Sequence, residues 1–278
     1  MEFKNTEIFN FEGAFRGMRN PLESWKKSDS IFCEHKQVNQ ADYYRIAKGW
    51  IAYENTKREK ENKSLIEPGT EEWYEIEDKC IEKLINSNGI LLGPNDVGLA
   101  QRLLRGGNEH AKFMRQIFVS VDITAPLYWW KEFDTYKIGT TANSTSTMHK
   151  LMSKPFTFDM FSFDLENEDI EVSKTKIDET NGELINLILT LEDFYFDIIE
   201  NCNILRKKYL ETKDLAYWRA LVQILPNAFN QTRTWTANYA VLRTMYFQRR
   251  NHKLKEWHEF CNWIATLPYS EELIMLED

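Results

Sequence analysis

Apolar residues recur at helical spacing in several separate stretches of this chain. One stretch begins near residue 40 and becomes strongly charged from Asn55 to Lys63, as expected for a helix with a solvated face. A second follows Pro68-Gly69-Thr70, where Thr70 suits the N-cap position. The longest helical pattern runs from Glu183 to Leu210, and its apolar stripe is interpreted as core or subunit interface. Residues 1–35, by contrast, are aromatic and irregular.

A strand and two loops are predicted in the middle of the chain. Residues 117–124 alternate in polarity and are rich in β-branched side chains, which favours a strand. Pro126 then suits the first turn of a helix. Residues 139–147 are small and polar, as in a plain linker or in a loop that lets its backbone approach a ligand. Residues 164–182 are acidic and polar and predict an exposed loop.

Further helices are predicted on both sides of this region. They run from Asn95 or Asp96 to Leu104, from a cap at Asp214 to Leu225-Pro226, from about Thr234 to Arg250, and from about Leu254 to Thr266. Helix therefore dominates, and the pattern indicates an α/β (α+β) chain with few strands.

Composition excludes several classes of protein. The 278 residues carry a net charge of −8, so the chain lacks the basic field that binding to a nucleic acid polymer requires. No stretch reaches the roughly 20 apolar residues of a membrane span, and no signal-peptide pattern begins the sequence. The four cysteines are far apart, which predicts neither disulfides nor a zinc site and fits a reducing, cytoplasmic setting.

Common catalytic motifs are missing from the sequence. There is no phosphate-binding P-loop, no dinucleotide-binding glycine fingerprint, no zinc-protease helix and no nucleophile elbow. His252 and His258 are six residues apart, so they do not share one face of a helix. We therefore expect no metal site.

Three blocks of residues carry a more specific signal. The first is Gly107-Asn108-Glu109-His110-Ala111-Lys112-Phe113, which leads into the predicted strand. The second is Tyr136-Lys137-Ile138, followed by Gly139 to Thr145 and then Ser146. The third is Leu225-Pro226, then Arg233-Thr234-Trp235-Thr236-Ala237-Asn238, then Arg249. In their order and spacing, over roughly residues 90–265, these blocks resemble the flavin-dependent thymidylate synthases.

The match to this family is uneven. His110 and Phe113 fall on a histidine and a phenylalanine of the family's first block, while Gln116 replaces its second histidine. Asn143 and Ser146 match the family's Asn-Glu-x-Ser core, in which Ser144 replaces the glutamate. The third block matches the family's Leu-Pro, Trp-Thr-x-Asn and Leu-Arg elements.

The largest departure lies in the second block. The family carries an Arg-His-Arg triplet where this chain has Tyr136-Lys137-Ile138. A further family arginine falls on Val222, and Arg219, one helical turn away, is a candidate to compensate. Losing charged phosphate contacts would weaken nucleotide binding by several kcal/mol, at about 1.5–3 kcal/mol for each charge-assisted hydrogen bond.

The resemblance implies a fold and a reaction. It implies a single domain over residues 1–278, with a small central sheet and a divergent helical part over residues 1–90. It also implies reductive methylation of deoxyuridine monophosphate (dUMP) with FAD as cofactor, and with NADPH and methylenetetrahydrofolate as co-substrates. The expected partners are a pyrimidine deoxynucleotide and further copies of the chain in a homotetramer.

The resemblance also assigns roles to individual residues. Arg249 would contact and polarise the uracil ring, as the residue expected to be catalytic, while Ser144 and Ser146 would bind the substrate. The flavin would be contacted by His110, Lys137, Asn143 and Asn238. Asn238 and Arg249 are eleven residues apart, which on one helix places them on nearly the same face, about 16 Å apart.

Two alternatives follow from the missing triplet. The chain would then keep the fold but act on another nucleotide or perform another C5 modification. Otherwise it would be a non-catalytic nucleotide-binding relative.

Overall fold

The structure is a computed structural model that describes residues 1–32, 40–87, 89–165, 170–177, 180, 182 and 184–277. Cys33 and His35 lie outside the described residues. The chain separates into two compact units. The first unit contains Met1–Lys4, Asp122–Tyr136 and Ala142–Thr234, and the second contains Asn5–Val121, Lys137–Thr141 and Trp235–Asp278. That the whole chain forms a single domain stays a prediction.

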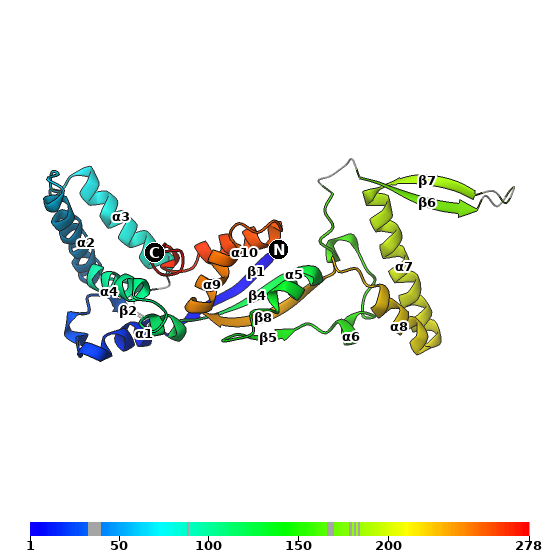
Figure 1. Cartoon of the computed structure of the whole chain (residues 1–278), viewed down its shortest axis with the longest axis horizontal. Helices are drawn as coiled ribbons and strands as arrows, with labels where there is room; N and C mark the ends of the chain where they lie inside the picture. The colour runs from blue at the N-terminus through cyan, green and yellow to red at the C-terminus, as the bar shows by residue number, and fades with distance from the viewer. Residues whose placement is uncertain are drawn as a thin grey trace. The chain divides into compact units, whose positions relative to one another are not determined.

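Helices dominate the described residues, and the strands form three small sheets (Figure 1). The α-helices are α1 (Phe11–Met18), α2 (Gln40–Lys60), α3 (Glu71–Asn86), α4 (Pro94–Arg105), α5 (Leu127–Phe133), α6 (Thr147–Lys150), α7 (Leu191–Thr212), α8 (Leu215–Ile224), α9 (Tyr239–Arg249), α10 (Lys255–Ala265) and α11 (Ser270–Leu273). The strands are β1 (Glu2–Phe9), β2 (Ile31–Phe32), β3 (Ile90–Leu91), β4 (Phe118–Pro126), β5 (Thr141–Ser144), β6 (Glu171–Ile177), β7 (Leu184–Thr190) and β8 (Asn230–Asn238). Short 3₁₀ helices are η1 (Asn20–Leu22), η2 (Trp25–Lys27), η3 (Ala111–Gln116) and η4 (Phe158–Met160). This helix-rich α+β class agrees with the prediction from the sequence.

The central sheet has the strand order β1-β4-β8-β5. Polar side chains pair across β4 and β8: Ser120 with Thr236, Asp122 with Thr234, and Thr124 with Thr232. The residue numbers rise on one strand as they fall on the other, so the two strands run antiparallel. The alternate residues of β4, from Val119 to Ala125, are buried. One face of β4 is therefore apolar, and its other face meets the threonines of β8 through polar side chains.

A buried ion pair holds the segment after α1 to α4. Arg19 Nε donates to Asp96 Oδ1 over 2.6 Å, and both side chains are almost completely buried. The hydroxyls of Ser28 and Ser30 also donate to the Asp96 carboxylate. Asp29 caps α4, since the backbone N–H groups of Asn95 and Asp96 donate to its carboxylate. The helix begins at Pro94, just before the predicted start at Asn95 or Asp96.

Several predicted elements are confirmed closely. The strand predicted over residues 117–124 is β4, and the capped helix after Thr70 is α3, with the Trp73 N–H donating to the Thr70 hydroxyl. The helix capped by Asp214 is α8, and the last long helix is α10. Pro126 ends β4 and stands at the N-cap of α5, not inside its first turn. Residues 1–35, read as irregular, contain β1 and α1.

The longest predicted helix is wrong at its start. Residues 184–190 form β7, which pairs antiparallel with β6, and the helix begins only at Leu191 (Figure 1). The apolar residues there fit a helical stripe equally well, so pairing with β6 decided the outcome. The β6 strand also corrects the loop predicted over residues 164–182. Thr190 marks the true helix start, because its hydroxyl accepts from the Asp193 N–H.

The helix predicted from Thr234 is wrong in the same way. Residues 230–238 form β8, and α9 begins at Tyr239. The threonines at 232, 234 and 236 alternate along one face, which is a strand pattern of β-branched residues.

Among the described residues, no helix is both long and apolar enough to cross a membrane.

Candidate functional site

Asn238 stands at the junction of β8 and α9. Its Oδ1 accepts from the Val241 N–H over 3.1 Å, so the side chain caps α9. The residue is buried, and its Nδ2 is not the atom used in this cap. Asn238 is therefore held firmly in place while its amide group keeps donor capacity.

The segment of Lys137 and Gly139 approaches this junction closely. Gly139 has φ of 75°, and a Cβ added there would lie 3.3 Å from Asn238 Nδ2 and 3.4 Å from Val241 Cγ2. Only glycine adopts this backbone conformation without strain and leaves that space open. The structure thus brings the second sequence block to Asn238. The side chains of Lys137 and Ile138 are exposed.

Arg249 ends α9, at the other end of the same helix. Its guanidinium carbon lies 4.5 Å from the centre of the Trp257 ring, and Trp257 is fully buried in α10. This cation–π stacking orients the guanidinium. Asn238 is the N-cap before the first turn of α9, and not a residue inside the helix, as the helix predicted from Thr234 required.

His110 lies just before η3 and is exposed. Its ring approaches the backbone of Gly106, where an added Cβ would lie 3.1 Å from His110 Cδ2. The η3 helix packs against α9. His110, Lys137, Asn238 and Arg249 all belong to the second unit.

Asn143, Ser144 and Ser146 belong to the first unit. The loop predicted over residues 139–147 is wrong in part, because β5 covers Thr141–Ser144 as an edge strand beside β8. Asn143 and Ser144 are exposed there, and Ser146 is half-buried. Pairing of the strand with β8, continued by the Thr145 N–H donating to the Thr232 carbonyl, overrode the loop composition.

Ser146 lines a small cavity of about 110 Å³ in the first unit. Lys150 and Lys154 also line it, and the sequence reasoning missed both residues. A signal was present, since two lysines four residues apart follow a run of four hydroxyl residues, Ser144 to Thr147. Arg219, the expected substitute for the missing arginine, does not line this cavity.

Other basic residues near the blocks have structural partners. Arg233 Nη1 donates to Asp134 over 2.6 Å, and its guanidinium stacks on Trp130. Lys131 donates to Asn227. These contacts stabilise the first unit and leave neither cation as a strong candidate for ligand binding.

The described cysteines do not offer a nucleophile. Burial raises the pKa of the Cys80, Cys202 and Cys261 thiols to about 11, so each stays protonated near neutral pH. Burial likewise raises the pKa of Tyr239, whose hydroxyl donates to the Pro268 carbonyl. The described residues contain no group of histidine, cysteine and carboxylate side chains arranged to hold a metal ion.

A larger cavity, of about 490 Å³, lies among α2, α3 and α4. None of the site residues predicted from the sequence lines this cavity, and its lining contains both acidic and basic side chains. Arg58 and Glu72, for example, pair within it. Size alone therefore does not make this cavity the functional site.

Comparison with known proteins identifies the fold. No family model matches the sequence, and no curated protein matches it. Among solved structures, flavin-dependent thymidylate synthase ThyX from Helicobacter pylori, complexed with FAD and dUMP, matches with a TM-score of 0.54. The two chains are 14% identical, and the match covers 99% of this chain and 98% of that one. A second structure of the Helicobacter pylori enzyme with FAD and dUMP matches with a TM-score of 0.50, 12% identity and coverage of 99% and 97%. This chain therefore shares the overall fold of the flavin-dependent thymidylate synthases.

Proposed function

We propose that this protein is a flavin-dependent enzyme that acts on a pyrimidine deoxynucleotide, with reductive methylation of dUMP as its reaction. The observation that carries the proposal is the extent of the fold likeness. It spans 99% of this chain and 98% of a thymidylate synthase solved with FAD and dUMP. The three sequence blocks that resemble the family lie at η3, at the segment from Tyr136 to Ser146, and at β8 and α9. Their position supports the same reaction class.

The residues of the second unit fit a flavin nucleotide. Asn238 is held by its capping bond and retains an amide donor, and Gly139 keeps the adjacent space free of a side chain. Lys137 and His110 are exposed and would add a cation and an imidazole. By the family resemblance, Asn143 would also be a flavin-binding residue. When bound, FAD would supply the hydride that the methylation requires.

Arg249 would act on the substrate. Its guanidinium is oriented by the Trp257 ring and always carries its charge, so it would polarise a pyrimidine carbonyl. Ser144 and Ser146 would donate hydroxyl hydrogen bonds to the nucleotide. Methylenetetrahydrofolate would supply the one-carbon unit and NADPH the electrons, and the active form would be a homotetramer in the cytoplasm.

One observation favours an alternative function on the same fold. Ile138 is 91% exposed and stands where the family carries a charged residue, so this position offers no ionic contact to a phosphate. The same fold with another nucleotide or another C5 chemistry would explain this change. A non-catalytic nucleotide-binding relative is the second alternative.

Absorption spectra test the flavin proposal. We expect the purified protein, alone or after incubation with FAD, to show the visible bands of bound oxidised flavin. Asn238→Asp keeps an oxygen that caps α9 but removes the amide donor, so it should weaken FAD binding by about tenfold and leave the melting temperature nearly unchanged. A colourless protein that does not bind added FAD would contradict the proposal.

Activity assays separate the alternatives. Methylation of dUMP in the presence of FAD, NADPH and methylenetetrahydrofolate would support the main proposal. FAD binding that responds to a different pyrimidine nucleotide would support altered chemistry. Nucleotide binding without turnover of any of these nucleotides would indicate a non-catalytic relative.

A further inference from the structure

The cavity beside Ser146 has an unusual lining. Hydroxyl and amide groups come from Thr145, Ser146, Thr147, Ser153 and Asn230, and the cations are Lys150 and Lys154. No carboxylate is among the residues that line it. Hydroxyl groups and ammonium groups both donate hydrogen bonds, so this lining suits an oxyanion.

The size of the cavity limits what it can hold. Its volume of about 110 Å³ is well below the roughly 300–1,000 Å³ typical of pockets for whole ligands. A single compact group fits this space, and a ring with its sugar does not. Lining and size together point to one phosphate group.

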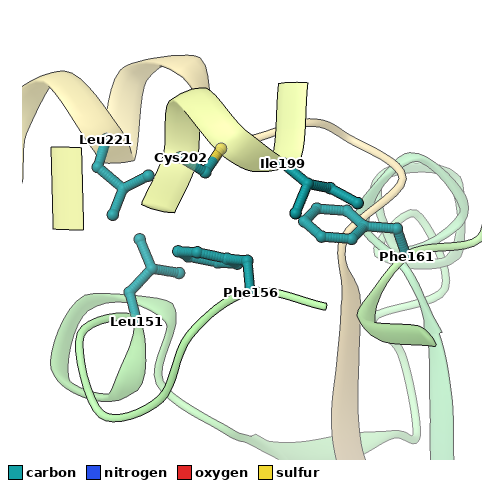
Figure 2. Close-up of a cluster of buried hydrophobic side chains, with 6 residues drawn as sticks. All are labelled: Leu151, Phe156, Phe161, Ile199, Cys202 and Leu221. Atoms are coloured by element: carbon teal, nitrogen blue, oxygen red, sulfur yellow. The ribbon is translucent and has the colours of Figure 1, made fainter. Parts of the chain in front are cut away.

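One side of the cavity is formed by buried hydrophobic side chains. Leu151 and Phe156 line it and also belong to a buried cluster with Ile199 and Cys202 of α7 (Figure 2). Figure 2 shows Leu151 pointing toward the helices that carry Cys202 and Leu221, with the Phe156 ring lying between them. The cavity is therefore built on the hydrophobic core of the first unit.

The backbone around the cavity is anchored at its two ends. At the start, the Thr145 N–H donates to the Thr232 carbonyl, and Gln231 Nε2 donates to the Thr145 carbonyl. At the end, the Asn203 side chain binds both the N–H and the carbonyl of Phe156, at 2.8 and 2.9 Å.

Two further contacts hold the middle of this segment. Arg206 Nε donates to the Met152 carbonyl over 3.1 Å, and Trp218 Nε1 donates to the Met148 carbonyl over 3.4 Å. The segment from Thr145 to Phe156 is thus fixed to β8, α8 and α7. Such preorganisation reduces the entropy lost when a ligand binds.

The two lysines are available for a ligand. Both side chains are exposed, and within the described part of the chain no hydrogen bond or ion pair engages either ammonium group. The nearby Arg206 and Arg233, by contrast, are held by the Met152 carbonyl and by Asp134. Lys150 and Lys154 are therefore the cations that the cavity can offer.

We propose that this cavity binds the phosphate group of the ligand and that Lys150 and Lys154 supply the positive charge. The inference rests on the proposed function only for the identity of the ligand, because the lining itself selects a phosphate. The phosphate dianion, which predominates above its second pKa of about 6, binds best.

Calorimetry with three probes tests the proposal: dUMP, deoxyuridine and inorganic phosphate. The variant is Lys150→Ala/Lys154→Ala, and the matched control is Lys207→Ala/Lys208→Ala, which removes two exposed lysine charges from α7. We expect the first variant to weaken dUMP binding by about 10- to 100-fold and the control to change it less than twofold. Deoxyuridine, which lacks the phosphate, should bind both variants equally.

The outcomes separate this inference from the proposed function. If dUMP does not bind but inorganic phosphate binds in a lysine-dependent way, the function fails and the phosphate site stands. If dUMP binds equally well to the wild type and to Lys150→Ala/Lys154→Ala, the phosphate site is overturned and the function stands. If neither dUMP nor phosphate binds the wild-type protein, the phosphate site is overturned as well.

Discussion

At the scale of single residues, Gly139 and Asn238 show how backbone conformation allows a close approach between two segments. Gly139 has a positive φ and lies against the amide of Asn238. Asn238 in turn uses one side-chain atom for the helix cap, which leaves the other for binding. In the proposed flavin site, Oδ1 of Asn238 would thus serve stability and Nδ2 would serve binding.

Substituting Gly139 separates two effects. We expect Gly139→Ala to cost about 1–2 kcal/mol of unfolding free energy for its left-handed backbone, and in addition to lower FAD affinity because its methyl group contacts Asn238. Gly69→Ala is the matched control, since Gly69 has φ of 82° with open space around it. Chemical denaturation and FAD titration measure both quantities. Equal FAD affinity in the two variants would argue against a ligand contact near Gly139.

At the scale of elements, α7 supports the cavity through one side chain. Asn203 binds both polar groups of the Phe156 backbone, which lies at the end of the lysine-bearing segment. Because Asn203 lies on the long, partly buried helix α7, it fixes the position of this segment. Secondary structure here positions a loop that has little regular structure of its own.

Removing this contact should loosen the segment. We expect Asn203→Ala to lower the free energy of unfolding by about 1–3 kcal/mol, since it leaves the Phe156 N–H and carbonyl without their partner. It should also weaken phosphate binding several-fold. The control is Asn201→Ala on the same helix, where the side chain only donates to the Asp197 carbonyl on the protein surface. Thermal melts and phosphate titrations of both variants test this, and identical behaviour would refute the role of Asn203.

At the scale of the whole molecule, the β6–β7 hairpin exposes three large apolar side chains on one face. Its register places Leu184, opposite Ile177, and Ile188 on one face. These side chains are 74%, 66% and 68% exposed. The other face contains Lys174, which pairs with Asp197 of α7. Exposed apolar clusters of this kind are typical of interfaces between proteins.

We therefore expect this hairpin to contribute to the proposed homotetramer. Light scattering should give a mass four times the 33.1 kDa of the protomer. Leu184→Ser/Ile188→Ser should shift the protein to smaller species, because it removes apolar area from the interface. Ile85→Ser, at a similarly exposed position on α3, should leave the assembly unchanged. A wild-type monomer would contradict the tetramer.

Whether an element could be predicted from the sequence depends on whether the residues that stabilise it are close to it in the sequence. Helices with a local cap, such as those after Thr70 and Asp214, could be located from the sequence. The strand β7 could not, because an apolar run suits both a helix and a strand until a partner strand is present. The cap of α4 was hidden for a related reason, since Asp29 lies 66 residues before the N–H group it binds.

For the candidate site, the order and spacing of the sequence blocks, through their resemblance to the family, predicted Asn238, Arg249 and Ser146, and these roles stay predictions. Tertiary structure decided which groups accompany them: Gly139 beside Asn238, Trp257 against Arg249, and two lysines beside Ser146. Gly139 and Trp257 come from other elements than Asn238 and Arg249, so only folding brings each of these pairs together. Helices and their local caps depend on residues that are close in the sequence, so a short pattern predicts them. The surroundings of a binding site depend on packing between residues that are distant in the sequence, which a short pattern does not predict.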